Sequence, residues 1–197
     1  MKGSTMNTTT DRRVRRTKKQ LTESLAKLLC EKPLKNITVR EISELADISR
    51  GTFYLHYRDV YDMVEQLQNE MFDRLNEIID GCDKESPVER LNSILKAMLE
   101  LLDENRELSK CLLSKNGDAV FTDRVKQQIL TRCFQPIYDN RSFNPAIDFK
   151  YFSNFIISGS VGVISEWLET GSLDTPDEIA ALLESLIKNG ASALINM

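Results

Sequence analysis

The sequence predicts an all-α protein of about nine helices. Apolar residues recur at intervals of three and four along most of the 197 residues, and the two-residue alternation of a half-buried strand is almost absent. The apolar content of 41% is sufficient for a sizeable hydrophobic core, which excludes a disordered chain. These features together favour a helical bundle.

Three helices are predicted near the N-terminus. The first has a stripe of leucines over residues 21–29 and ends near Pro33, because proline cannot continue a helix. The second begins after Thr38, whose spacing from Glu41 is that of a capping box. The third is expected over Ser49–Tyr57, with serine as its N-cap.

The sequence pattern of the remaining chain predicts one larger helical bundle, with no segment that has the pattern of a strand. Gly81 and Gly171 are expected to end two of its helices, and Thr175 begins the last one. Residues 140–145 are expected to form a loop. The approximate helical ranges are 59–81, 87–102, 108–113, 118–138, 145–170 and 175–195.

The charge is unevenly divided along the chain. The net charge of −4 by itself disfavours a nucleic-acid-binding protein. However, residues 1–60 carry 13 Lys and Arg against 7 Asp and Glu, whereas residues 61–197 carry 13 against 23. This asymmetry indicates two surfaces with different partners, and the basic surface is expected to bind a polyanion.

Several other classes of protein are disfavoured. Four scattered cysteines and a single histidine provide no zinc set, so no metal or other cofactor is expected, and the cysteines are typical of a reducing cytoplasm. The N-terminus has no signal peptide, and the longest uncharged stretch, Tyr151–Ser165, is too short to cross a bilayer. An enzyme is disfavoured because no nucleophile and base surround His56, although two buried carboxylates facing one cavity would revive that alternative.

The second and third helices have the spacing of a helix-turn-helix. Residues 46–49 separate them, and Asp47 can adopt the tight backbone that this turn requires. A basic run at residues 12–19 carries six charges in eight residues just before the first helical stripe, where it could neutralise phosphates. Alternative interpretations are a solvated arm or a segment that binds an acidic membrane surface.

The stretch Ile37–Tyr57 resembles the signature of the tetracycline-repressor (TetR) family of transcriptional regulators, and the resemblance covers about residues 12–65. Residues Phe155–Glu169 more weakly resemble the dimerisation helix of one branch of that family. The Thr-rich start, Thr8–Thr10, predicts a disordered arm over residues 1–11. The resemblance implies a helix-turn-helix DNA-binding domain over 12–60 and a ligand-binding and dimerisation domain over 61–197.

By position, the resemblance implies that the third helix contacts bases and phosphates and that Gly51 permits its close approach to the duplex. This chain departs from the family pattern at Asp47, where glycine is usual, and at Val60, where lysine is common. His56 has the alternative role of a structural histidine that caps the next helix. The predicted DNA-binding residues are Arg15, Arg16, Lys18, Thr38, Val39, Arg50, Gly51, Thr52, Tyr54, Leu55, His56, Tyr57 and Arg58.

The resemblance also implies a mostly apolar effector cavity in the C-terminal domain. Methionine and aromatic residues at helical spacing more often form plain core than a cavity, and that alternative stays open. No charged residue stands out as a polar anchor for a ligand. The predicted pocket residues are Met63, Leu67, Met71, Leu95, Met98, Leu99, Phe121, Phe134, Phe152 and Phe155.

A homodimer through the last two helices is predicted, because small residues on the first of them permit close approach and the second has an apolar face. Internal packing within one chain is the alternative. The predicted interface residues are Ser158, Gly159, Gly162, Trp167, Leu182, Leu183 and Leu186.

The sequence thus predicts a cytoplasmic, homodimeric regulator, most simply a repressor released from a palindromic operator by a small apolar effector. Its expected partners are double-stranded operator DNA, a small-molecule effector and a second copy of the chain, with no membrane. A protein-interaction module whose DNA-binding surface has decayed is the alternative, and substitution of Arg50 or Tyr54 distinguishes the two.

Overall fold

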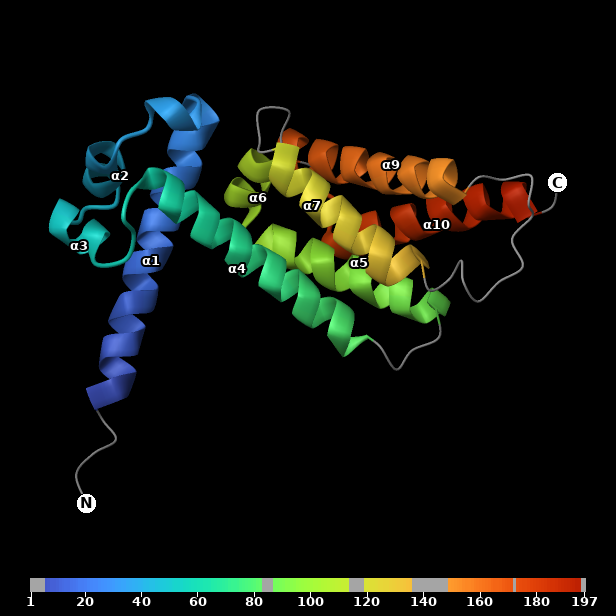
Figure 1. Ribbon diagram of the computed structural model, residues 1–197, viewed down its shortest axis with the longest axis horizontal. Coiled ribbons are helices and arrows are strands. Elements are labelled where there is room, and N and C mark those ends of the chain that lie inside the picture. Colours follow the sequence, from blue (N-terminus) through green and yellow to red (C-terminus); the bar gives the residue numbers. More distant parts are fainter. Residues whose placement is uncertain (1–5, 83–86, 114–118, 136–148, 172, 196–197) are drawn as a thin grey trace, which may run out of the picture. The chain divides into compact units, whose positions relative to one another are not determined.

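The computed structural model describes residues 6–82, 87–113, 119–135, 149–171 and 173–195, and over these residues its regular secondary structure is helical, with no strand (Figure 1). The predicted all-α fold is therefore confirmed. Two compact units, Met1–Asn69 and Glu70–Met197, divide the chain. Among the described residues no helix is both long and apolar enough to cross a membrane.

The N-terminal unit contains α1 (Met6–Glu31), the short 3₁₀ helix η1 (Leu34–Asn36), α2 (Val39–Leu45), α3 (Arg50–Tyr54) and the first turns of α4 (Val60–Gly81). Its core is formed by apolar residues from each α-helix. Leu21, Leu25, Ile42, Phe53 and Met63 are all fully buried.

Two predicted boundaries of this unit need correction. Helix α1 begins at Met6, so residues 6–11 are helical rather than part of a disordered arm, and residues 1–5 lie outside the described residues. The unit ends at Asn69 rather than at residue 60. The physical reason for the second difference is that α4 buries Val60 and Met63 in its first turns and continues without a break into the next unit.

The C-terminal unit contains the rest of α4 together with α5 (Pro87–Glu104), α6 (Arg106–Leu113), α7 (Ala119–Ile129), α9 (Phe149–Thr170) and α10 (Pro176–Ile195). Helix α7 continues into a π-helical turn, η2 (Leu130–Phe134). The predicted loop at 140–145 lies outside the described residues. Gly171 ends α9 with a positive φ of 62°, and Thr175 caps α10 through Glu178, as the sequence predicts.

The core of this unit is a single apolar cluster. Helix α10 packs along α5 and beside α9, while α6 packs on α9 (Figure 1). Leu99, Leu168 and Leu183 from three of these helices are almost completely inaccessible to solvent. These helices therefore form a bundle that surrounds the cavity described below.

Candidate DNA-binding surface and apolar cavity

The turn between α2 and α3 is built around Asp47. Asp47 is the one non-glycine residue with positive φ, 53°, in the part of the chain described. The backbone N–H of Ile48 donates to the carbonyl of Ser43 at 3.0 Å, which closes the turn after α2. Aspartate tolerates this left-handed backbone better than most residues, so the turn forms without glycine.

Ser49 fixes the start of α3. Its Oγ accepts a hydrogen bond from the backbone N–H of Thr52 at 3.1 Å and lies 2.9 Å from the Thr52 hydroxyl. This cap satisfies one of the backbone N–H groups that the first turn of the five-residue α3 leaves free.

Helix α3 has an apolar inner side and an exposed outer side. Phe53 is fully buried, whereas Tyr54 is 57% exposed and Leu55, the C-cap, is 81% exposed. Arg50 and Gly51 are also exposed, and Thr52 is half-buried. A Cβ at position 51 would meet only the Ser49 Oγ, at 3.6 Å, so glycine is not required there by the protein's own packing.

Tyr57 differs from the prediction. It is buried, its ring lies 5.6 Å from that of Phe53, and the Lys18 ammonium lies 5.9 Å from its ring centroid. A direct DNA contact by Tyr57 is contradicted, because the i+4 spacing from Phe53 places both rings on the inward face. Tyr57 instead supports α3 from within the unit.

Further predicted DNA-binding residues lie on α1 and at the start of α2. Thr38 caps α2 in the predicted capping box with Glu41, and Val39 follows it, half-buried. On α1, Arg15 and Arg16 are exposed, while Lys18 is half-buried against Tyr57. Arg15 and Arg16 are therefore accessible to phosphates, whereas Lys18 is partly covered.

The pKa values of two groups near α3 are lowered, those of His56, which follows α3, and of Asp62 in the first turn of α4. Partial burial, and secondarily the charge of Lys18, lower the pKa of His56, which favours the neutral imidazole at neutral pH. Asp62 accepts hydrogen bonds from the Arg58 backbone N–H at 2.8 Å and from its guanidinium at 2.9 Å, and these bonds lower the pKa of Asp62. Arg58 is thus exposed but already paired within the protein.

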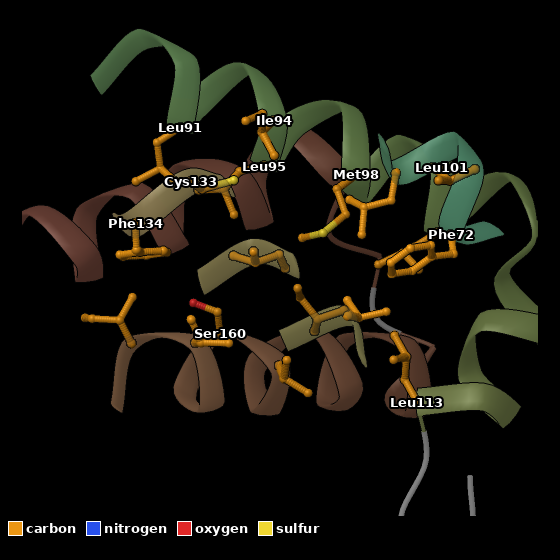
Figure 2. Close-up of a pocket in the computed structure, with 18 of the residues that line it drawn as sticks. Phe72, Leu91, Ile94, Leu95, Met98, Leu101, Leu113, Cys133, Phe134 and Ser160 are labelled. Atoms are coloured by element: carbon orange, nitrogen blue, oxygen red, sulfur yellow. The ribbon is translucent and has the colours of Figure 1, made fainter. Parts of the chain in front are cut away.

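The C-terminal unit contains an apolar cavity of about 80 Å³ between α4, α5, α6, α7, η2, α9 and α10 (Figure 2). Of the predicted pocket residues, Met71, Leu95, Met98, Phe121 and Phe134 line it. Its other lining residues are Phe72, Leu75, Leu91, Ile94, Leu101, Leu102, Leu113, Val125, Ile129, Cys133, Ile156, Ile157, Ser160, Val161, Ile164 and Ile187.

Five predicted pocket residues lie elsewhere. Met63 and Leu67 are buried in the N-terminal unit, and Leu99 is buried in the core without lining the cavity. Phe152 packs against the apolar cluster, and Phe155 is 72% exposed. Choosing aromatic residues on α9 gave the wrong positions, because the aliphatic residues Ile156, Ile157 and Val161 line the cavity instead. The four-residue spacing of Phe121, Val125, Ile129 and Cys133 was the signal available in the sequence.

The predicted interface residues divide into two groups. Ser158, Gly159 and Gly162 lie exposed on α9, and Leu182 and Leu186 are 47% and 52% exposed on α10. Trp167 and Leu183, by contrast, are buried within the chain, which contradicts their assignment to an interface surface.

Trp167 is held inside the unit by specific contacts. Its indole N–H donates to the Asp174 carbonyl at 2.9 Å, and the Arg106 guanidinium lies 4.6 Å from its ring centroid. Arg106 also donates to the Trp167 carbonyl at 2.6 Å. This tryptophan therefore joins α6, α9 and the turn before α10.

Comparison with known proteins gives matches both to the C-terminal unit and to most of the chain. A family model described as "Transcriptional regulator C-terminal region" (TetR_C_8) matches residues 89–189. The HTH-type transcriptional regulator YxbF of Bacillus subtilis is 23% identical over 172 residues, and the match covers 85% of this chain and 44% of YxbF. The chain therefore spans less than half the length of that relative.

Two further proteins resemble the chain over most of its length. The HTH-type transcriptional repressor KstR2 of Mycolicibacterium smegmatis is 29% identical over 187 residues, covering 87% of this chain and 88% of KstR2. The crystal structure of the transcriptional regulator FadR from Bacillus subtilis in complex with stearoyl-CoA has a TM-score of 0.65 at 15% identity, covering 87% of this chain and 97% of that one. The latter likeness shows a shared fold.

A capped helix-turn-helix with an exposed second helix, in a chain whose relatives regulate transcription, defines a DNA-binding transcriptional regulator rather than an enzyme. The described residues contain no cluster of three or more His, Cys, Asp or Glu that could hold a metal ion. The family model covers just over half of the sequence, and the chain belongs to the TetR family.

Proposed function

We propose that the protein is a homodimeric, ligand-responsive repressor that binds a near-palindromic operator. The observation that carries this proposal is the outer side of α3, where Arg50, Tyr54 and Leu55 project from a turn fixed by Ser49. A recognition helix needs such exposed side chains on a rigid support, because contacts with base edges require a fixed register.

The roles of these side chains follow from their chemistry. Arg50 can bind a guanine edge or a phosphate, and the Tyr54 hydroxyl can donate to a phosphate oxygen. Leu55 suits apolar contact with a thymine methyl group. Arg15 and Arg16 on α1 add sequence-independent phosphate contacts.

The homodimer is supported by the exposed faces of α9 and α10. The α9 face carries Gly159 and Gly162, where an added Cβ would meet no neighbouring element within 4 Å, and the α10 face carries Leu182 and Leu186. Exposed leucines on one helix and small residues on its neighbour suit a four-helix interface between two chains. Two recognition helices would then enter successive major grooves about 34–36 Å apart.

The effector is proposed to enter the cavity of the C-terminal unit. Its volume of about 80 Å³ is well below the roughly 300–1,000 Å³ typical of pockets for drug-sized ligands, so binding requires the lining to move apart or a slender ligand. An effector that binds the wider conformation more tightly would shift the dimer toward it and lower its affinity for the operator. The stearoyl-CoA complex of the Bacillus subtilis FadR structure, which has the same fold, supports a ligand with a long apolar chain.

The DNA-binding proposal is tested with full-length protein and genomic fragments selected for binding, followed by gel-shift titration on the selected sequence. Arg50→Ala and Tyr54→Ala should each weaken specific binding by about 1–3 kcal/mol. Lys27→Ala removes one exposed cation of α1 outside the basic run and is the matched control. Unchanged binding in both α3 variants would contradict the proposal and favour a protein-interaction module.

A further inference from the structure

One charged side chain lies in line with the cavity-facing residues of α5. Ile94 and Met98 both line the cavity, and Arg90 is four residues before Ile94. Positions four apart lie on one face of a helix, one turn above another, so Arg90 continues the cavity-facing stripe by one turn.

The contacts of Arg90 agree with this placement. It is half-buried, its Nε is inaccessible to solvent, and one terminal nitrogen donates to the carbonyl of Arg132 in η2 at 3.4 Å. Arg132 directly precedes Cys133, which lines the cavity beside Phe134. The guanidinium of Arg90 therefore bridges α5 and η2 where both helices supply cavity walls.

This bridge lies at one end of the cavity. In Figure 2, Leu91, Cys133 and Phe134 lie at one end, whereas Phe72 and Leu113 lie at the other. Ser160, whose hydroxyl is the one side-chain oxygen among the described lining residues, lies in this view toward the same end as Phe134. The side chains that line the Phe72 end are thus apolar, whereas the Ser160 hydroxyl and the Arg90 bridge lie toward the other end.

Other arginines around the cavity are placed differently. The Arg132 guanidinium is paired with Asp80 of α4, and only its carbonyl faces Arg90. Arg124 is exposed and stacks 3.8 Å from the ring centroid of Phe72, at the opposite end. Of these three arginines, Arg90 is the one whose guanidinium lies partly buried between two walls of the cavity.

We propose that the cavity binds a slender amphipathic anion whose apolar chain lies among Ile94, Met98 and their neighbours and whose anionic head pairs with Arg90. A guanidinium held partly out of water favours an anion strongly, because charge-assisted hydrogen bonds strengthen where solvent is excluded. The apolar lining offers the rest of such a molecule a site free of competing polar groups. This inference rests on the proposed effector cavity and replaces a plain apolar effector with an anionic one.

The test compares ligands with identical chains and different head groups. Calorimetric titration of the full-length protein would use sodium alkanoates, alkyl phosphates, acyl-CoA thioesters and primary alcohols of eight, twelve and sixteen carbons, below their micellar concentrations. We expect at least one anionic series to bind about tenfold or more tightly than the alcohol of equal length, as a charge-assisted hydrogen bond predicts. The order among carboxylate, phosphate and CoA thioester identifies the head group.

Two variants assign that preference to Arg90. Arg90→Gln should reduce the anion-to-alcohol preference to about threefold or less while alcohol affinity stays near the unmodified value, and Arg90→Lys should restore part of it. Arg124→Gln removes an exposed cation at the other end of the cavity and should leave the preference intact.

Equal binding of anions and alcohols, a preference that survives in Arg90→Gln, or no binding by any chain length would overturn the inference. Gel shifts on the same protein preparations measure DNA binding, so a failure of the anionic-ligand proposal can be distinguished from a failure of the proposed function. Loss of the head-group preference with specific DNA binding retained contradicts the anionic ligand alone. If specific DNA binding is absent but the ligand preference still depends on Arg90, the proposed regulator function is contradicted and the anionic ligand is not.

Discussion

Asp47 combines a strained backbone with a negative charge beside the proposed DNA-binding surface. Its backbone adopts φ 53°, which costs free energy in any residue with a Cβ, and its carboxylate adds negative charge directly before the recognition helix. Glycine would remove both the strain and the charge, whereas asparagine would remove only the charge. These two substitutions therefore separate backbone from electrostatic effects.

Asp47→Gly is expected to raise the free energy of unfolding by up to about 1 kcal/mol, because the left-handed backbone no longer opposes a side chain. Both Asp47→Gly and Asp47→Asn should tighten operator binding, since a like charge near the phosphates is lost. Urea unfolding and gel-shift titration measure the two effects. Tighter binding in the glycine variant alone would show that strain, not charge, limits recognition.

The lowered pKa of Glu41 predicts that the stability of the fold depends on pH. A hydrogen bond from Lys32, and next those from Thr38, lower its pKa from 4.5 to about 2. The folded state therefore favours the charged carboxylate, and its contribution is complete above about pH 4.5 and lost as the pH falls through about 2.

Glu41→Gln should therefore be less stable than the unmodified protein at neutral pH, and the difference should shrink as the pH falls from about 5 toward 2. Glutamine keeps one acceptor oxygen for the Thr38 backbone N–H of the capping box but loses the charge and the bond from Lys32. Denaturant unfolding at a series of pH values measures the difference. A gap that stays constant over this range would contradict the role of the carboxylate.

At the scale of elements, α10 illustrates how adjacent residues take different roles. Leu182 and Leu186 project outward, whereas Leu183 is 1% exposed within the core. A 100° rotation per residue separates neighbouring side chains on a helix, so one leucine can stabilise the chain and the next can serve an interface.

Leu182→Glu with Leu186→Glu should convert the proposed dimer to monomers and leave the thermal transition of the monomer nearly unchanged, because both side chains are solvent-exposed in the chain. Leu183→Ala should instead lower the free energy of unfolding by about 2–5 kcal/mol through a core cavity. Sedimentation velocity and calorimetry distinguish the effects. A double variant that remains dimeric would locate the interface elsewhere.

At the scale of the whole molecule, charge follows the division into units. Residues 1–69 carry 13 Lys and Arg against 9 Asp and Glu, and residues 70–197 carry 13 against 21. The unit with the helix-turn-helix is thus cationic, and the unit with the cavity is anionic. An anionic body resists non-specific association with DNA, which leaves orientation to the basic unit.

This distribution predicts a strong salt dependence of operator binding. Replacing Arg15 and Arg16 together with glutamine should make the slope of log K against log salt concentration less negative by about 0.9 per lost phosphate contact. Lys27→Gln removes a cation from the same helix and is the control. Equal slopes for the double variant and the unmodified protein would exclude Arg15 and Arg16 from the phosphate contacts.

Local signals explain which features were predictable. The capping box at Thr38, the cap at Ser49 and the glycine at 171 each involve residues within four positions of one another, and the structure confirms all three as helix ends. The cavity was predicted only in part, because five of its ten expected residues line it. The start of α1 was also missed, since the polar run at 6–11 has no apolar periodicity to indicate a helix.

The sequence by itself determined the all-α class, the helix-turn-helix and most helix ends, because helical periodicity and capping depend on near neighbours. Only the tertiary structure decided which side of each helix faces which partner. It turned Phe155 outward, buried Trp167 against Arg106, and set Arg90 beside the carbonyl of Arg132. Such contacts join residues distant in sequence, and their energy depends on how whole helices pack rather than on residue type.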